Sequence, residues 1–145
     1  MSRFLPVVLV CIVLAVAGSP PGSAETAAEL RGLRGEFAAA YAAEDWPQAI
    51  ALGTRLAEVD PRGDLSAFNL ACVHSLAGDH EAAVRWLRAS AEAGFARPRI
   101  VTADADLDAI RHEPGYAEAV ALIEHNRMRE FDAFKAAFEQ ASIRV

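Results

Sequence analysis

Cys72 and the four histidines are side chains that could form a thiol–imidazole pair or bind zinc. Cys72 and His74 come nearest to a thiol–imidazole pair, but residues two apart on a helix point to different faces. We therefore expect Cys72 to pack as a small hydrophobic residue. The remaining histidines, His80, His112 and His125, lack the spacing of zinc ligands. The sequence predicts no metal site.

Three aspartates at alternate positions, Asp104, Asp106 and Asp108, resemble the start of a calcium-binding loop. Such a loop needs glycine at its sixth position and glutamate at its twelfth. Ala109 and Gly115 stand there, so the match fails, and helix capping accounts for the acids. The chain also has no glycine-rich phosphate loop and no nucleophile elbow. We expect no cofactor and no enzyme activity, which leaves a binding surface as the functional element.

Helices are the elements that would present this surface, and residues 64–94 give their clearest pattern. Two stretches with helical apolar periodicity are separated by a turn at Gly78 and Asp79. Glycine permits the left-handed conformation that ends the first helix, and the aspartate can cap the second. Asp64 is expected to cap the first helix in the same way. The segment therefore predicts a helical hairpin.

The same pattern occurs once more upstream at a fixed distance. The interval from Asp45 to Asp79 is the same as that from Ala49 to Ala83. At about 34 residues, this interval is the period of the tetratricopeptide repeat, and the chain resembles this family over about residues 30–94. The family's small eighth and twentieth positions fall on Ala71 and Ala83, its Gly-Asp turn on Gly78-Asp79, and its closing Asp-Pro on Asp60-Pro61.

Three positions depart from the family's pattern. Phe37 takes the small eighth position of the first unit, Gly53 takes an aromatic position, and His74 replaces an aromatic residue. The resemblance nevertheless implies an all-α fold, an α-solenoid of about two and a half helical hairpins with a C-terminal capping helix. The expected units are residues 30–63, 64–97, a degenerate closing unit at 98–125, and a last helix to about residue 140.

In the tetratricopeptide family the first helices of the units line a concave groove. The matching positions here are Arg31, Arg34, Ala38, Tyr41, Leu65, Phe68, Cys72 and Ser75. The resemblance thus implies a non-enzymatic scaffold that binds a peptide or a partner protein. Arg31 and Arg34 would converge on one carboxylate of an acidic peptide, over an apolar floor of Tyr41 and Phe68. The alternative, that these are ordinary solvated or inter-repeat positions, stays open.

The C-terminal part predicts one long helix with an apolar seam. The seam positions are Tyr116, Val120, Ile123, Arg127, Phe131, Phe134 and Phe138. We expect the three phenylalanines to fold back onto the first helices. The alternative is that they form a partner or homodimer surface, which would make the protein a structural accessory subunit.

The N-terminus has the pattern of a secretory signal peptide. Arg3 precedes the apolar run Val7–Ala17, and glycine, proline and small residues follow it. The run is shorter than the roughly 20 residues of a membrane span. We expect residues 1–24 to be removed and residues 25–145 to be exported, to a periplasmic or extracellular location.

Protein from the exported fraction should then have the intact mass of a chain that begins at Glu25. A mass that includes the first methionine would instead favour an uncleaved membrane anchor.

Net charge and cysteine content limit the classes of partner and the disulfides that this chain could have. The chain carries a formal net charge of −6, and removal of residues 1–24 takes away one basic residue and no acidic one. This balance argues against nucleic acid as a partner. Cys11 would leave with the signal, so Cys72 would have no partner for an intramolecular disulfide. The remaining roughly 120 residues suffice for one domain with a single core.

Overall fold

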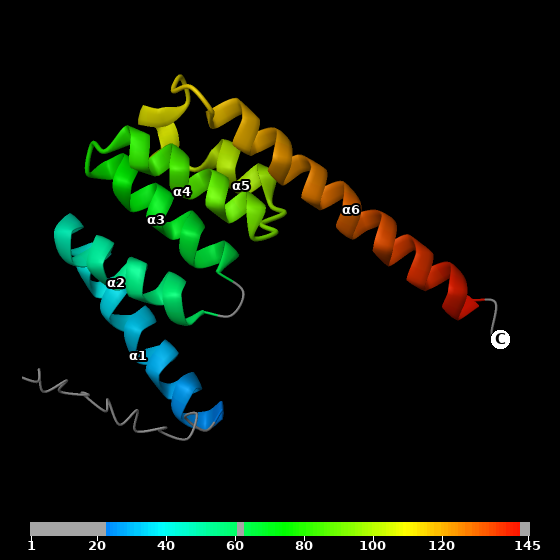
Figure 1. Cartoon of the computed structure of the whole chain (residues 1–145), viewed down its shortest axis with the longest axis horizontal. Coiled ribbons are helices and arrows are strands. Elements are labelled where there is room, and N and C mark those ends of the chain that lie inside the picture. The colour runs from blue at the N-terminus through cyan, green and yellow to red at the C-terminus, as the bar shows by residue number, and fades with distance from the viewer. Residues whose placement is uncertain (1–22, 61–62, 143–145) are drawn as a thin grey trace, which may run out of the picture.

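The computed structural model describes residues 23–60 and 63–142, and within these ranges every regular element is a helix (Figure 1). The elements are α1 (Ser23–Ala42), α2 (Trp46–Val59), α3 (Asp64–Leu76), α4 (His80–Glu92), α5 (Pro98–Ala103), the 3₁₀-helix η1 (Ala105–Ile110) and α6 (Tyr116–Ser142). The prediction of an all-α fold is confirmed for this part of the chain.

The helices pack in chain order. α1 packs on α2, α2 on α3, α3 on α4, and α4 on the first part of α6. η1 packs against α3, and α5 packs against α6. Two helical hairpins therefore lie side by side, and the α5–η1–α6 segment covers the outer side of the second (Figure 1).

The turns within the two hairpins have the same backbone geometry at positions one repeat period apart. Asp45 and Asp79 cap α2 and α4, and each side chain accepts a hydrogen bond from the backbone N–H three residues later, at 3.2 and 3.1 Å. The residues just before them, Glu44 and Gly78, both have positive φ angles, of 56° and 81°. Glu44 thus adopts the left-handed conformation in which its counterpart is glycine.

The core has two connected parts. One lies between α1, α2 and α3, and the other joins α3 and α4 to α5, η1 and α6. Ala49 and Ala83 are fully buried, which places the small residue of each unit at a helix–helix contact. At Gly53 a Cβ atom would lie 2.8 Å from Cδ2 of Leu70. A glycine therefore lets α2 and α3 approach closely at this position.

One local prediction was wrong. Asp64 does not cap α3: Gly63, with φ of 59°, precedes the helix, and Asp64 lies in its first turn without a side-chain cap bond. Residues 95–97 form a short loop after α4, and α5 begins at Pro98. Phe95 is fully buried and stacks on Phe68 with 4.8 Å between ring centroids. A single aromatic residue in a glycine- and proline-flanked segment gives no periodicity from which this burial could be inferred.

The long last helix was predicted correctly, but its expected return to the first helices was not. Buried residues on α6 end at Asn126, and the helix then continues away from both hairpins (Figure 1). Phe131, Phe134 and Phe138 are 57, 68 and 65 % exposed. The reason is the straightness of α6: without a turn after Asn126, its second half cannot reach α1.

The predicted signal peptide lies outside the described residues except for Ser23 and Ala24, which begin α1. Among the helices that the structure describes, none combines the length and apolar character needed to cross a membrane.

Candidate binding groove

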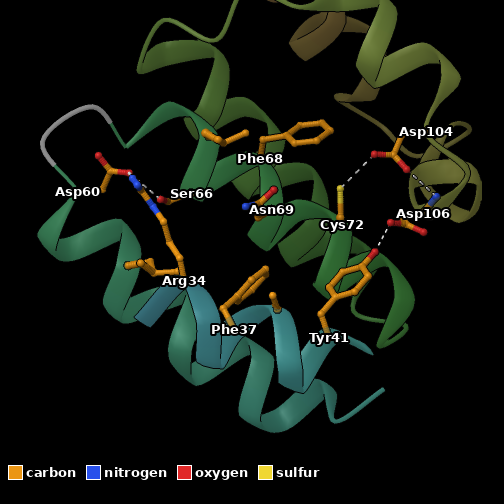
Figure 2. A pocket seen from close by; sticks show the side chains of 13 residues that line it. Arg34, Phe37, Tyr41, Asp60, Ser66, Phe68, Asn69, Cys72, Asp104 and Asp106 are labelled. Carbon is orange, nitrogen blue, oxygen red and sulfur yellow. Dashed lines mark hydrogen bonds and ion pairs between the residues drawn. The ribbon is translucent and has the colours of Figure 1, made fainter. Parts of the chain in front are cut away.

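A cavity of about 440 Å³ opens between α1, α3 and the turn that leads into η1 (Figure 2). α1 and α3 are the first helices of the two hairpins, so the cavity lies on the face where the family resemblance placed a groove. Residues of α1 and α3 form its two walls, and Asp104 and Asp106 close one end. We call this cavity the groove.

At the opposite end of the groove, Arg34 of α1 reaches across to the C-terminal end of α2. Its guanidinium donates to the carboxylate of Asp60 at 3.0 Å, and the hydroxyl of Ser66 donates to the same oxygen at 3.1 Å. This ion pair links α1, α2 and α3. It also means that the positive charge of Arg34 is already matched by a carboxylate within the protein.

The middle of the groove is largely apolar. Phe37 and Phe68 lie on opposite walls, and Leu65 at the rim is largely exposed. Phe68 is held in place by its stacking on Phe95. Asn69 lies between the charged end and the far end and points into the space between the walls (Figure 2). A segment lying here would meet apolar walls and one side-chain amide.

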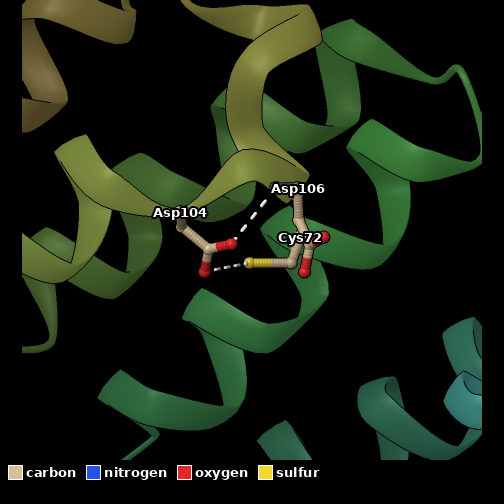
Figure 3. Close-up of side chains that lie close together, drawn as sticks. All are labelled: Cys72, Asp104 and Asp106. Carbon is tan, nitrogen blue, oxygen red and sulfur yellow. Dashed lines mark hydrogen bonds between the residues drawn. The ribbon is translucent and has the colours of Figure 1, made fainter.

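Tyr41, Cys72, Asp104 and Asp106 form the second polar end, which we call the acidic end. The Tyr41 hydroxyl donates to the carboxylate of Asp106, and the Cys72 thiol donates to that of Asp104 at 3.8 Å (Figures 2 and 3). Asp104 also accepts from the backbone N–H of Asp106 at 3.1 Å, which caps η1. The capping role expected for the aspartates is thus confirmed for Asp104.

Burial is the main cause that raises the pKa of the Cys72 thiol, and the nearby charges of Asp104 and Asp106 raise it further. The pKa of Tyr41 is raised by burial first and then by its hydrogen bond to Asp106. Both groups therefore stay protonated at neutral pH. A protonated thiol is a weak nucleophile, so Cys72 acts here as a hydrogen-bond donor.

The acidic end also contains the one group of potential metal ligands found among the described residues. The Cys72 sulfur and one carboxylate oxygen each of Asp104 and Asp106 lie within 4.8 Å of one another (Figure 3). A metal would have to displace the thiol proton, whose loss is opposed first by burial and then by the charges of the surrounding acids, since both raise the pKa of Cys72. The arrangement fits a neutral donor between two carboxylates better than a prepared metal site.

The structure brings most of the predicted groove positions together around this cavity. Six predicted positions line it: Arg34, Ala38, Tyr41, Leu65, Phe68 and Cys72. Arg31 is exposed outside it, and Ser75 is buried at 3 % exposure within the helix packing. Since Arg34 pairs with Asp60, the two arginines do not converge on a common carboxylate.

The acidic groove residues that sequence reasoning missed lie outside the first helix of either hairpin. Asp60, Asp104 and Asp106 all line the groove, although Asp104 is 32 residues from Cys72. Leu107 and Ile110, three residues apart in η1, are fully buried and hold η1 against α3. That apolar pair was the available signal that the preceding aspartates would lie beside α3.

A second exposed feature is the row of Phe131, Phe134 and Phe138, which we call the Phe stripe. The rings of Phe134 and Phe138 lie 6.5 Å apart, on the unsupported part of α6. Glu130 and Lys135 flank the stripe, and Lys135 lies 4.0 Å from Glu139. This is a contiguous apolar row on a helix that makes no contact with the groove.

No family model, curated protein or solved structure matches this chain. The functional assignment therefore depends on the geometry of the groove and of the Phe stripe.

Proposed function

We propose that this protein is a non-enzymatic interaction module of the tetratricopeptide type, exported from the cytoplasm, whose groove holds an extended segment of a partner protein. The observation that carries the proposal is the cavity between α1 and α3. It is supported by the two matching turns, which lie one repeat period apart, and by helices that pack in chain order.

The dimensions and chemistry of the groove suit a peptide. Its volume of about 440 Å³ lies within the usual range of ligand pockets and accommodates a few side chains. Phe37 and Phe68 offer apolar walls for side chains. The Asn69 amide can both donate to and accept from the backbone of an extended segment.

Filling the groove should abolish peptide binding. Ala38 and Ala39 are neighbouring exposed alanines on α1, but only Ala38 lines the groove. We expect A38W to weaken, by at least tenfold, the binding of peptides selected from an array of random nine-residue sequences. Micromolar wild-type affinity would correspond to about −8 kcal/mol. Fluorescence polarisation on the chain from Glu25 onward is the measurement.

The matched control is A39W, which adds the same ring one position away and should leave peptide affinity unchanged. Both variants should retain the helical circular dichroism of the wild type, because both alanines are exposed. Equal loss in the two variants, or an array from which no peptide is selected, would contradict a binding role for the groove.

The Phe stripe supports a second candidate function, a structural subunit that self-associates, and a second copy is the occupant it fits best. If Phe131, Phe134 and Phe138 take core positions of a parallel helix pair, Glu130 of one copy stands opposite Lys135 of the other, since residues five apart meet across such a pair. The pairing would be formed twice by symmetry. Arg127 of one chain would face Arg127 of the other, and these like charges repel. The contact between the two helices is therefore confined to the residues after Arg127.

The exposed apolar area of the Phe stripe is also close to what a small specific interface requires. A phenylalanine that is about 60 % exposed offers roughly 100–150 Å². With Met128, which is also exposed, two copies would bury about 1,000 Å² of apolar surface, near the lower limit of a specific interface. The oligomeric state of the chain in solution tests this candidate.

A further inference from the structure

We propose that the acidic end of the groove binds a cationic side chain of the partner segment, so that the groove selects a basic segment with apolar neighbours over the acidic peptide that its sequence suggested. This inference rests on the proposed function of the groove, and it names the chemical class of its ligand. It is argued from the positions of Asp104, Asp106, Tyr41 and Cys72, and from the finding that no cation among the described residues forms an ion pair with either carboxylate.

The two carboxylates of the acidic end are held close together by neutral donors. Tyr41 orients Asp106, and Cys72 and a backbone N–H orient Asp104. A neutral donor fixes the direction of a carboxylate but does not cancel its charge. One oxygen of each carboxylate and the Cys72 sulfur lie within 4.8 Å of one another, so two negative charges share one small region.

None of the basic groups described around the groove forms an ion pair with these two carboxylates, although the charge of Arg111 acts on Asp104 from a distance. Arg34 is paired with Asp60 at the other end. Arg111 approaches the acidic end, but its guanidinium donates to the Asp108 carboxylate at 2.7 Å and to the backbone carbonyl of Asp104 at 3.2 Å. In the described part of the chain no basic group lies within ion-pair distance of the Asp104 or Asp106 carboxylate.

A guanidinium fits this end of the groove. Its planar fork of donors can bond two neighbouring carboxylates at once, and an ammonium can reach the same oxygens as a point charge. The apolar stem of either side chain would lie along the groove toward Phe37 and Phe68. Because Asp104 and Asp106 are only half exposed, the pair would form in a region of reduced solvent screening.

A divalent metal ion is the competing occupant, and the protonated Cys72 disfavours it. A thiolate is the form of cysteine that binds a metal, and here the thiol proton is shared with Asp104. An organic cation needs no proton to leave and uses only the carboxylate oxygens. The neutral Tyr41 and Cys72 donors can remain in place when it binds.

The test compares three pools of nine-residue peptides, random except at the fifth position, which is arginine, norleucine or glutamate. Binding of each pool to the chain from Glu25 onward is measured by fluorescence polarisation. We expect the arginine pool to bind at least tenfold more tightly than the norleucine pool, and the glutamate pool to bind most weakly. The arginine preference should decrease as the salt concentration rises.

Asp104→Asn combined with Asp106→Asn should remove the arginine preference. Asparagine still caps a helix and still accepts a hydrogen bond, so the fold and the Tyr41 contact are retained while the charge is lost. The control is Asp108→Asn, which removes one acid from η1 that pairs with Arg111 and does not line the groove. This variant should keep the preference.

Two results would overturn the inference while leaving the groove's function intact: pools that bind equally well but are blocked by A38W, or an arginine preference that survives the double asparagine variant. Stoichiometric Zn²⁺ binding by calorimetry that needs Asp104 and Asp106, without an arginine preference, would also overturn it. Failure of every pool to bind would instead remove the proposed function itself.

Discussion

Replacing Phe95 by alanine is expected to lower the free energy of unfolding by about 3–5 kcal/mol. The ring is fully buried, stacks on Phe68, and lies where the chain leaves α4 for α5. Its loss would leave a cavity next to the groove wall, because the helices around it are fixed by their own contacts. Denaturant unfolding followed by circular dichroism measures the change.

Phe134→Ala is the matched control, because it removes the same ring from a position that is 68 % exposed. At concentrations where the chain is monomeric, this change should alter the free energy of unfolding by no more than about 0.5 kcal/mol. A cost at Phe134 as large as that at Phe95 would mean that α6 folds back onto the hairpins in solution. A cost below about 1 kcal/mol at Phe95 would mean that the α4–α5 junction is not part of the cooperative core.

Phe134→Glu is expected to convert the proposed dimer into a monomer. In the parallel pair proposed above, the two glutamates would face each other in the centre of the Phe stripe, where burial of like charges is costly. We expect dimer affinity to fall at least 100-fold, or by about 2.8 kcal/mol. Sedimentation velocity over a range of micromolar concentrations is the measurement.

Two further variants separate the interface from a general effect of charge. Ala136→Glu adds the same charge to an exposed position off the Phe stripe and should leave the dimer intact. Glu130→Lys should weaken the dimer, because the new lysine would face Lys135 of the other copy. Adding Lys135→Glu to the same chain should restore the opposite charges and the dimer. A wild-type chain that stays monomeric at 100 µM would exclude a second copy as the occupant of the Phe stripe.

Local patterns in the sequence were sufficient to predict most of the helices. The repeat spacing located both hairpins because Asp45 and Asp79 act through bonds to residues only three positions away. The direction of α6 was not predictable in this way, because periodicity gives the apolar face of a helix but not where the neighbouring helices end.

The groove walls followed from the repeat, whereas its polar ends did not. Arg34 was expected to bind an acidic peptide, but within the fold it pairs with Asp60, 26 residues away. Asp104 was explained by its cap on η1, and this local role concealed a second contact with Cys72. Long-range partners of charged residues are set by the packing of helices on one another, which a single sequence does not specify.

The length of α6 beyond Asn126 bears on how the protein would be degraded. Proteases require a segment that opens locally, and residues 127–142 have no buried side chain to oppose opening. Cleavage there would remove the Phe stripe and leave both hairpins and the groove intact. Coverage by a second copy would protect the same residues, so unassembled chains would be trimmed first and assembled ones would persist. The projecting helix would thereby make the lifetime of the intact chain depend on whether it has found its partner.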